Sequence, residues 1–278
     1  MIEHRIRTAL AYCTTLACAT LSQFTLAAEF APGDKHVALG SSFAAGPGVD
    51  LQLGNCGRST NNYANLTARA LGLTLVDVSC NGATTDNILD TPQNGAAPQI
   101  EAVTTNTALV TVTIGGNDIN YTSSTFACAG TATDEQCTAN LDQDAISEAV
   151  EQLPGKLTAT INAIKERAPQ ASIVVVTYPR VFPPNAANCS ELELSPADTA
   201  YLADLGRRLE QAFVTVTQSE EVLIADSYVG EAGHGPCAMP ETARWVNGAT
   251  TVVDGIRYHP TGAGHIEMSR LVLEALED

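Results

Sequence analysis

The chain has 278 residues, of which 45% are hydrophobic and 16% are charged. This composition can fill the core of a globular domain and excludes a disordered chain. Lys and Arg number 14 against 31 Asp and Glu, which gives a net charge of −17. Because nucleic-acid affinity comes mainly from basic groups that neutralise phosphates, we expect no nucleic-acid partner. After the N-terminal region no apolar run reaches membrane-spanning length, so we expect no stable membrane anchor.

Residues 1–27 have the composition of a secretory signal peptide. The segment combines basic, apolar and small residues in that order: Arg5 and Arg7, then Ala9 to Leu26, then Ala27 and Ala28. We therefore predict a signal peptide over residues 1–27, a mature domain over 28–278 and a secreted, extracellular protein. A buried N-terminal helix is the alternative.

Six cysteines follow the predicted signal peptide. They are Cys56, Cys80, Cys128, Cys137, Cys189 and Cys237. An even number in an exported chain favours three disulfides, although the spacing alone selects no pairing. A zinc site is the alternative, but the chain has no Cys-x-x-Cys pair and no close cluster of His and Cys. It also lacks a P-loop and a dinucleotide-binding fingerprint. We therefore expect no metal and no cofactor.

Short β-branched apolar runs alternate with stretches of helical periodicity along the rest of the chain. In chain order, strands are predicted over 35–39, 73–79, 108–114, 171–177 and 222–225, and helices over 63–71, 145–167, 196–217 and 263–276. The segment 120–141 is rich in Thr, Ala and Cys without clear periodicity, so we expect a surface loop pinned by a disulfide. The alternation is typical of a doubly wound α/β sheet with buried parallel strands. No linker or repeat divides the chain, so we expect a single domain.

Glycines and small polar residues follow the first three predicted strands and precede the last helix. The four segments are Gly40-Ser41-Ser42-Phe43, Ser79-Cys80-Asn81-Gly82-Ala83-Thr84-Thr85, Gly115-Gly116-Asn117-Asp118 and Asp254-Gly255-Ile256-Arg257-Tyr258-His259-Pro260-Thr261. In a parallel sheet, ligands bind beyond the carboxyl ends of the strands. We therefore expect the four segments to converge at that edge.

In this order, the four segments resemble the sequence blocks of the SGNH hydrolases, the GDSL esterase/lipase superfamily. The chain is similar to the secreted, disulfide-containing esterases, lipases and phospholipases of actinomycetes and fungi. These share the extended start of the first block and a Trp-Val-Asn-Gly segment, here residues 245–248. The resemblance spans nearly the whole mature chain. It implies an α/β fold of the flavodoxin-like type, a three-layer sandwich around a central parallel sheet of about five strands.

The resemblance also implies a catalytic serine and histidine. It makes Ser42 the nucleophile and His259 the general base. The oxyanion-hole donors are the backbone N–H groups of Ser42 and Gly82 and the side-chain amide of Asn117. The chemistry requires such a set, because a serine hydroxyl must lose its proton as it attacks and imidazole titrates near neutral pH. Taken singly, each residue has an ordinary structural alternative, since serines cap helices and glycine and asparagine form turns.

Two positions depart from the pattern of the superfamily. Ser41 stands where an Asp usually precedes the nucleophile, but that Asp is not the proton acceptor, so Ser42 keeps its role. The triad Asp usually lies three residues before the His, where this chain has Ile256. Either Asp254 reaches His259 through a local bulge, or a backbone carbonyl near Ile256 accepts the Nδ1 proton and the enzyme works as a Ser-His dyad.

The predicted topology brings the cysteines together in neighbouring loops. The first two follow the first and second strands, the next two enclose a short loop, and the last two follow the fourth and fifth strands. We therefore prefer the pairs Cys56–Cys80, Cys128–Cys137 and Cys189–Cys237. The first pair would brace the oxyanion loop.

These features together predict a secreted serine hydrolase that cleaves carboxylic esters through an acyl-enzyme on Ser42. We expect a monomeric lipase or esterase that acts on lipid or short-chain acyl esters. Phospholipase A and polysaccharide acetylesterase activities are the alternatives. A catalytically inactive secreted binding module is an alternative of another class, supported by the displaced Asp254. It is disfavoured because Ser42, Asn117 and His259 are all present.

Overall fold

The computed structural model describes residues 29–130, 137–184, 189–229, 233–250 and 253–277. The predicted signal peptide over residues 1–27 lies outside the described residues.

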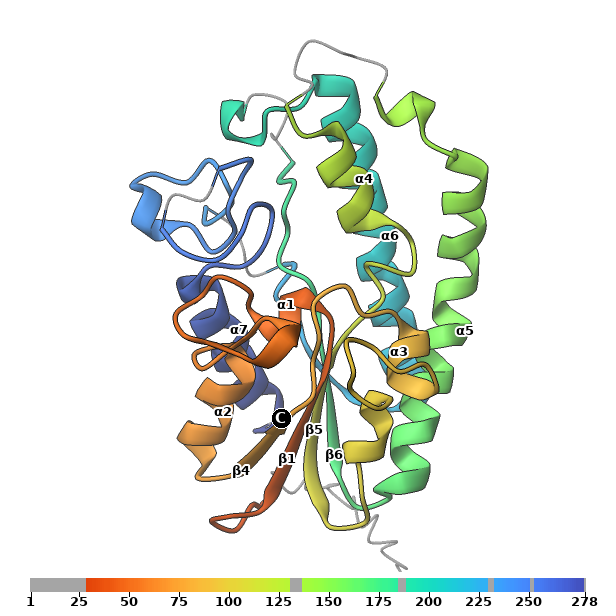
Figure 1. The fold of residues 1–278 in the computed structure, drawn as a ribbon, viewed down its shortest axis with the longest axis vertical. Helices are drawn as coiled ribbons and strands as arrows, with labels where there is room; N and C mark the ends of the chain where they lie inside the picture. Colours follow the sequence, from red (N-terminus) through yellow and green to blue (C-terminus); the bar gives the residue numbers. More distant parts are fainter. Residues whose placement is uncertain (1–28, 131–136, 185–188, 230–232, 251–252, 278) are drawn as a thin grey trace, which may run out of the picture.

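Five parallel strands form the central sheet (Figure 1). They are β1 (Lys35–Gly40), β4 (Thr74–Asp77), β5 (Thr107–Thr113), β6 (Ser172–Val176) and β7 (Leu223–Ala225). Their order across the sheet is β4-β1-β5-β6-β7. This is the flavodoxin-like order, in which the chain switches direction across the sheet between β1 and β5 and opens a crevice at their carboxyl ends. The register places Gly40 beside Thr113, so both strands end at the same level of that crevice.

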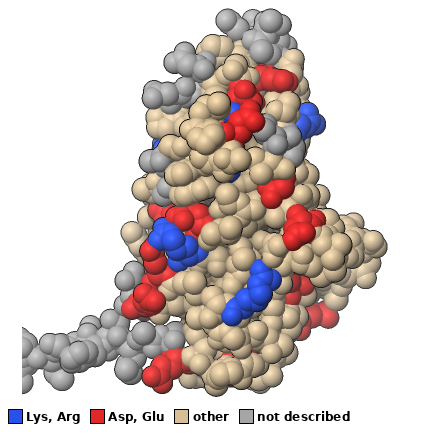
Figure 2. Space-filling model, turned by 90° about the vertical axis from the view of Figure 1, so that its left-hand side faces the viewer, with Lys and Arg blue, Asp and Glu red and all other residues tan. Residues whose placement is uncertain are grey.

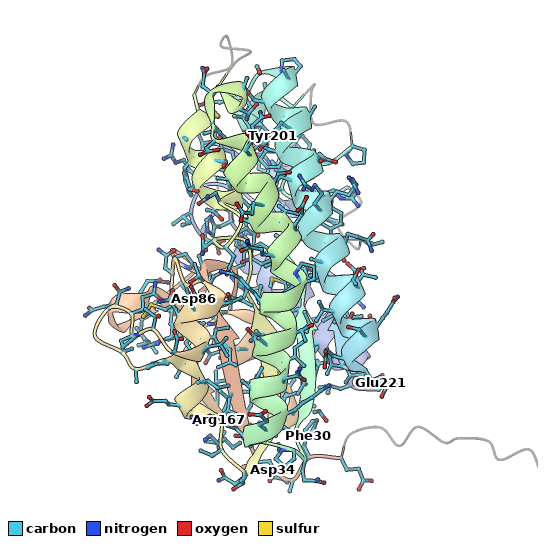
Figure 3. The ribbon with its side chains drawn as sticks, turned by 90° about the vertical axis from the view of Figure 1, so that its right-hand side faces the viewer. Phe30, Asp34, Asp86, Arg167, Tyr201 and Glu221 are labelled. Carbon is cyan, nitrogen blue, oxygen red and sulfur yellow. A yellow bond between two sulfur atoms is a disulfide. The ribbon has the colours of Figure 1, made fainter. Side chains whose placement is uncertain are left out.

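Helices cover both faces of the sheet and complete the three layers. One face carries α2 (Tyr63–Leu71) and α7 (Gly262–Ala275), and the other carries α5 (Gln143–Arg167) and α6 (Pro196–Glu220) (Figure 1). Figure 3 shows α5 and α6 side by side, from the level of Tyr201 down to Arg167 and Glu221. The shorter helices are α1 (Ser42–Ala45), α3 (Thr85–Leu89) and α4 (Tyr121–Cys128), and a small hairpin joins β2 (Gln52–Leu53) to β3 (Arg58–Ser59).

Alternate residues of the central strands point into two separate cores. Val37 and Leu39 of β1 pack toward α5 and α6, whereas Ala38 between them packs toward α2 and α7. Because both faces of the strands are buried, their sequences are continuous apolar runs rather than alternating patterns. This explains why the five strands could be predicted from the sequence, and it confirms the α/β class with a central parallel sheet.

The segment 120–141 differs from the surface loop expected for it. Residues Tyr121–Cys128 form α4, and Thr138–Asn140 form a short 3₁₀-helix. The Ser- and Thr-rich sequence of α4 has low helix propensity, so tertiary contacts determine its structure. The ring of Tyr121 packs edge-on against Phe182, and the absence of a side chain at Gly206 of α6 leaves room for the Tyr121 hydroxyl.

The six cysteines form the three bridges Cys56–Cys80, Cys128–Cys137 and Cys189–Cys237, the set preferred above. The first bridge joins the loop after β1 to the turn after β4. Next to it, the backbone N–H of Asn81 donates to the carbonyl of Cys56 at 2.9 Å. The bridge therefore holds the second of the four expected blocks, which contains Cys80, against the loop that follows the first block.

Acidic groups outnumber basic groups in this chain, with 31 Asp and Glu against 14 Lys and Arg. On the face in Figure 2, Asp and Glu side chains are spread widely, and Lys and Arg gather in a few places. None of the helices in the described part of the chain combines the length and the apolar character that crossing a membrane requires.

We expect the Cys56→Ser, Cys80→Ser double variant to lose about 3 kcal/mol of unfolding free energy, because the bridge restricts the unfolded chain. Urea denaturation without reductant, followed by circular dichroism, measures this loss. The matched control removes Cys189 and Cys237. Those cysteines are separated by 48 residues rather than 24, so the control should lose slightly more. Unchanged stability of the first variant would contradict the prediction.

Candidate active site

The turn between β1 and α1 presents Ser42 at the carboxyl edge of the sheet. Ser42 is the first residue of α1, so its backbone N–H has no acceptor within the helix. Gly40 ends the strand at φ 146°, and a Cβ there would lie 2.4 Å from the carbonyl oxygen of Thr113. Only glycine therefore allows β1 to approach β5 so closely before the turn. The side chain of Ser42 is almost fully enclosed, with 2% of the residue exposed.

A buried glutamine that the sequence analysis missed fixes this turn. The backbone N–H of Gly40 donates to Oε1 of Gln99 at 2.7 Å, and Nε2 of Gln99 donates back to the Gly40 carbonyl at 3.0 Å. This paired amide contact extends the hydrogen bonding of β1 beyond its pairing with β4, and the Gly40 carbonyl also accepts from the backbone N–H of Cys80 at 3.0 Å. It holds the backbone directly before the Ser41-Ser42 pair.

His259 lies against the Ser42 hydroxyl. Its Nε2 is 2.8 Å from Oγ of Ser42, and its Nδ1 is 2.8 Å from the carbonyl oxygen of Arg257. A carbonyl oxygen only accepts hydrogen bonds, so the proton of the neutral imidazole resides on Nδ1. Nε2 is then the free acceptor that faces the serine O–H. This arrangement suits a general base acting on a nucleophile.

Burial determines the protonation state of His259. The residue is 1% exposed, and burial lowers the pKa of His259 to about 4, although the hydrogen bond to the Arg257 carbonyl acts in the opposite direction. Aromatic rings account for part of this enclosure. The ring of Phe43 lies 4.7 Å from the imidazole between centroids, and that of Phe126 lies 6.0 Å away. The imidazole is therefore neutral at pH 7.

A tight turn brings the Arg257 carbonyl back onto the imidazole. Tyr258, between the two residues, has φ 56°, and the backbone N–H of His259 donates to the carbonyl of Ile256 at 3.3 Å. A left-handed backbone costs free energy for a bulky residue. Two contacts of the same residue hold it in place, because the Tyr258 hydroxyl donates to the Leu192 carbonyl at 2.7 Å and its ring packs edge-on against Phe126.

Asn247, in the Trp-Val-Asn-Gly segment, supports this turn from the other side. Its Nδ2 donates to the carbonyl of Asp254 at 2.6 Å and to that of Ile256 at 3.3 Å, and its backbone N–H donates to the His259 carbonyl. One residue thus holds the loop before the histidine, through its side chain at Asp254 and Ile256 and through its backbone at His259.

The Asp254 carboxylate lies at the start of α7. Its Oδ1 accepts a hydrogen bond from the backbone N–H of Gly262 at 2.8 Å, where the helix dipole favours a negative charge. Of the two alternatives for the group at Nδ1 of His259, the structure has the backbone carbonyl, that of Arg257. The Asp254 carboxylate is bonded to the Gly262 N–H instead, and its part in catalysis stays a prediction to be tested.

The remaining two blocks carry the other expected oxyanion donors, in the turns after β4 and β5. Gly82 lies in the turn after β4 with φ 81°, and Asn117 lies in the turn after β5. Nδ2 of Asn117 donates one hydrogen bond to the carbonyl of Ala83 at 2.8 Å, which fixes the orientation of its amide. The amide nitrogen carries a second N–H. With the backbone N–H groups of Ser42 and Gly82, it gives the donor set expected of an oxyanion hole.

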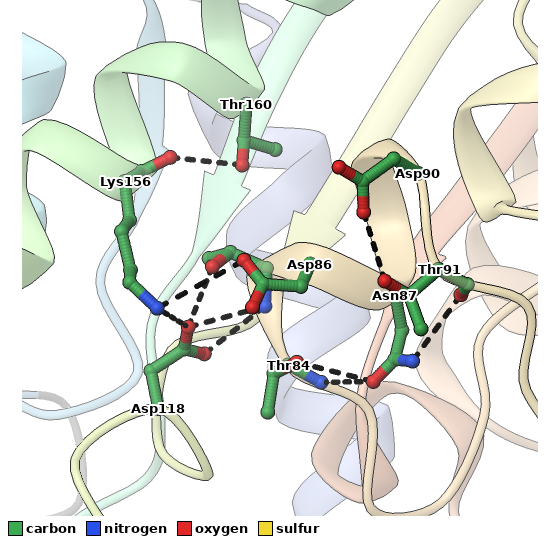
Figure 4. A network of polar contacts seen from close by, with 9 residues as sticks. Thr84, Asp86, Asn87, Asp90, Thr91, Asp118, Lys156 and Thr160 are labelled. Carbon is green, nitrogen blue, oxygen red and sulfur yellow. Dashed lines mark hydrogen bonds and ion pairs between the residues drawn. The ribbon is translucent and has the colours of Figure 1, made fainter.

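A buried carboxylate fixes the two donor turns relative to each other. Oδ1 of Asp118, directly after Asn117, accepts hydrogen bonds from Oγ1 and from the backbone N–H of Thr85, the first residue of α3. The Asp118 side chain is 1% exposed and forms an ion pair with Lys156 of α5 at 3.5 Å (Figure 4). Burial raises the pKa of Asp118, while the Thr85 hydrogen bonds and the charge of Lys156 oppose the rise.

The four expected blocks therefore lie at the carboxyl edge of the sheet, and the structure brings Ser42 and His259 into direct contact. The oxyanion-hole roles of Gly82 and Asn117 stay predictions. In the part of the chain that the structure describes, no group of three or more His, Cys, Asp or Glu side chains is placed to hold a metal ion.

Comparisons with known proteins agree with this arrangement. The model of the GDSL-like Lipase/Acylhydrolase family matches residues 38–265. Lipase 2 of Streptomyces coelicolor is 30% identical over 260 residues, which cover 90% of this chain and 88% of that protein. The lipase of Streptomyces rimosus is 30% identical over 233 residues, which cover 82% of this chain and 81% of that protein.

Solved structures with the same fold include two from Streptomyces. The extracellular lipase of Streptomyces rimosus aligns with a TM-score of 0.72 and 27% identity, over 87% of this chain and all of that one. Phospholipase A1 of Streptomyces albidoflavus aligns with a TM-score of 0.73 and 24% identity, over 88% of this chain and all of that one.

Since a carbonyl rather than the Asp254 carboxylate contacts the imidazole, we expect Asp254→Ala to reduce kcat by less than tenfold. Asp254→Asn retains an oxygen that can accept from the Gly262 N–H, so it should match the wild type more closely in both kcat and thermal stability. Steady-state hydrolysis of a p-nitrophenyl ester gives kcat, with His259→Ala as the inactive reference. A drop of several orders of magnitude in Asp254→Ala would show that the carboxylate takes part in catalysis.

Proposed function

The chain belongs to the GDSL-like lipase/acylhydrolase family and is a lipase or esterase of that family, and we propose a mechanism on this basis. In this mechanism the enzyme cleaves carboxylic esters through an acyl-enzyme on Ser42. One observation carries the proposal: the Ser42 hydroxyl lies 2.8 Å from Nε2 of His259, and Nδ1 of the same imidazole donates a hydrogen bond to the Arg257 carbonyl. A serine that only capped α1 would not require a buried imidazole at its hydroxyl.

Acylation begins with proton transfer from Ser42 to Nε2 of His259 as the serine oxygen attacks the ester carbonyl. The carbonyl oxygen becomes an oxyanion and accepts hydrogen bonds from the backbone N–H groups of Ser42 and Gly82 and from the Asn117 amide. His259 then donates its proton to the leaving alcohol. In the second half of the cycle, His259 removes a proton from water, which attacks the acyl-enzyme and releases the acid.

The Arg257 carbonyl orients the base without adding a charge. Its hydrogen bond keeps the imidazole in the tautomer with Nε2 free and accepts from Nδ1 when the imidazolium forms. In this proposal the enzyme works as a Ser-His dyad. Asp254 stabilises the start of α7 instead.

We expect the substrate to be a lipid or short-chain acyl ester, because the relatives at 30% identity are named lipases. The alternatives are hydrolysis of phospholipids or acetylated polysaccharides, and ligand binding without hydrolysis. The assays below distinguish them from hydrolysis of simple acyl esters.

The three disulfides and the signal-peptide-like residues 1–27 support secretion to the extracellular space, where disulfides persist. We propose a monomeric mature domain over residues 28–278 without a membrane anchor.

Hydrolysis of p-nitrophenyl esters from acetyl to palmitoyl tests the proposal. We expect activity that falls by at least a thousandfold in Ser42→Ala, with the fold unchanged by circular dichroism, because loss of a catalytic serine leaves only oxyanion stabilisation and binding. The chain-length profile distinguishes an esterase from a lipase. Equal rates in wild type and Ser42→Ala, or no hydrolysis of any ester including phosphatidylcholine and acetylxylan, would reject the proposed function.

The pH dependence of kcat/KM tests the state of the base. His259 acts in its neutral form and burial lowers its pKa to about 4, so kcat/KM should stay level as pH falls from 7 and then fall tenfold per unit below about 4. A decline of kcat/KM that begins near pH 6.5, the ordinary pKa of histidine, would contradict the effect of burial on His259.

The stability of the fold also depends on pH. His36 and His265 are buried with pKa values lowered to about 3, so below about pH 6.5 the unfolded chain binds protons that the folded protein does not, and the free energy of unfolding declines. Circular dichroism at each pH therefore separates unfolding from protonation of the base.

A further inference from the structure

The residue before the nucleophile has a buried partner that the reaction steps above do not use. Ser41 is fully buried, and its backbone N–H donates to the carbonyl of Thr113 at 2.9 Å. Its hydroxyl lies 2.8 Å from the hydroxyl of Tyr178, which follows β6. This is the position where the chain departs from the usual Asp of the superfamily. The departure therefore occurs at a hydrogen bond within the core and not at a solvent-exposed position.

The same tyrosine hydroxyl also contacts the turn that carries Asn117. The backbone N–H of Gly116 donates to the Tyr178 hydroxyl at 3.3 Å. A Cβ at Gly116 would lie 2.8 Å from Cε1 of Tyr178, so the turn packs directly on the ring. Tyr178 itself is 3% exposed. One phenol oxygen thus joins the residue before Ser42 to the residue before Asn117.

Of these two contacts, only the one with Gly116 has a fixed direction, since either hydroxyl can donate between Ser41 and Tyr178. Because the Gly116 N–H can only donate, the Tyr178 oxygen accepts there and its own proton is free to go to Oγ of Ser41. Burial raises the pKa of Tyr178 above its ordinary value, so the hydroxyl keeps this proton at neutral pH. The bridge between the two turns is then a chain of two neutral hydrogen bonds.

The ring of Tyr178 extends the contact to the general base. Its centroid lies 4.2 Å from that of Phe43, and Phe43 lies 4.7 Å from the imidazole of His259. On the other side, the ring stacks on Phe213 of α6 at 6.0 Å. The tyrosine is therefore fixed by the core and cannot follow a movement of either turn without breaking these packing contacts.

We infer that Tyr178 is a positioning residue for ester hydrolysis: with Ser41 as its acceptor, it sets the spacing between the Ser42 N–H and the Asn117 amide, the two sides of the oxyanion hole. The inference rests on the proposed function. In this inference the Ser41 hydroxyl accepts the Tyr178 hydrogen bond that a carboxylate at the same position would accept. Because the spacing matters most when the oxyanion forms, Tyr178 acts on the transition state more than on substrate binding.

Three variants test the inference: Tyr178→Phe, Ser41→Ala and the double variant. Each single variant should lower kcat tenfold to a hundredfold and change KM less than threefold, somewhat less than the loss of an entire oxyanion donor. The double variant should be no worse than the poorer single variant, because both remove the same hydrogen bond. The inhibition constant of an alkylboronic acid, which forms a tetrahedral adduct with the serine, should rise in parallel with the loss of kcat/KM.

Two further variants separate positioning from general stability. Tyr63→Phe removes another buried tyrosine hydroxyl, one that lies 3.1 Å from Oγ1 of Thr113, and should lower thermal stability while kcat stays within twofold. Ser41→Asp keeps an acceptor for the Tyr178 proton and should therefore retain kcat within tenfold of wild type. When Ser41→Asp is combined with Tyr178→Phe, the donor is absent and kcat should fall by more than tenfold. The acid limb of kcat/KM near pH 4 should remain in all variants, because the contact between His259 and Arg257 is intact.

Several outcomes would overturn the inference. These are a kcat within twofold of wild type in Tyr178→Phe, additive losses in the double variant, or equal activities of Ser41→Asp and Ser41→Ala. A loss of kcat with an unchanged boronate inhibition constant would equally reject a role in the transition state. A wild-type protein without Ser42-dependent hydrolysis would reject the proposed function and this inference together, whereas a Ser42-dependent enzyme that is insensitive at Tyr178 rejects only the inference.

Discussion

The hydrogen bond between Nδ1 of His259 and the Arg257 carbonyl is the constraint on which the site depends. The imidazole is almost completely buried, and burying a carboxylate beside it would cost several kcal/mol unless further donors paired with the charge. A backbone carbonyl fixes the same tautomer with a dipole and no net charge. Because the carbonyl brings no negative charge to offset the effect of burial, the pKa of His259 stays lowered to about 4. The base is therefore neutral over a wide pH range, but its imidazolium form is stabilised less than it would be beside a carboxylate. The oxyanion donors must then supply more of the transition-state stabilisation.

That requirement explains how strongly the donor turns are fixed. The sheet order places the ends of β1 and β5 side by side, which brings Ser42 and Asn117 to one crevice. Strand pairing alone ends at Gly40 and Thr113, so the turns beyond need their own support. Gln99 holds the backbone before Ser42, and a disulfide and the buried Asp118 hold the turn with Gly82.

The sequence predicted the parts of the structure that depend on local patterns. The five strands are continuous apolar runs because both faces are buried, and Ser42, Gly82, Asn117 and His259 lie in short motifs at strand ends. Helix α4 was missed because its Ser and Thr residues form a helix only through packing on α6. The choice between Asp254 and a carbonyl depended on the left-handed backbone at Tyr258, which no residue pattern indicates.

Gln99 and Tyr178 were missed for a different reason. Each acts at a distant point of the chain, 59 residues from Gly40 and 137 residues from Ser41, and neither belongs to a motif. Gln99 bonds the Gly40 backbone in the way that a paired strand would. Tyr178 bonds the Ser41 hydroxyl, which stands where a carboxylate is usual. A protein with three lysines and a net charge of −17 has few cations to pair with buried acids. Among the described residues, the buried Asp118 pairs with Lys156, whereas the contacts of Gln99, Tyr178 and the Arg257 carbonyl are neutral hydrogen bonds, so the precision of the oxyanion hole depends on packing more than on charge.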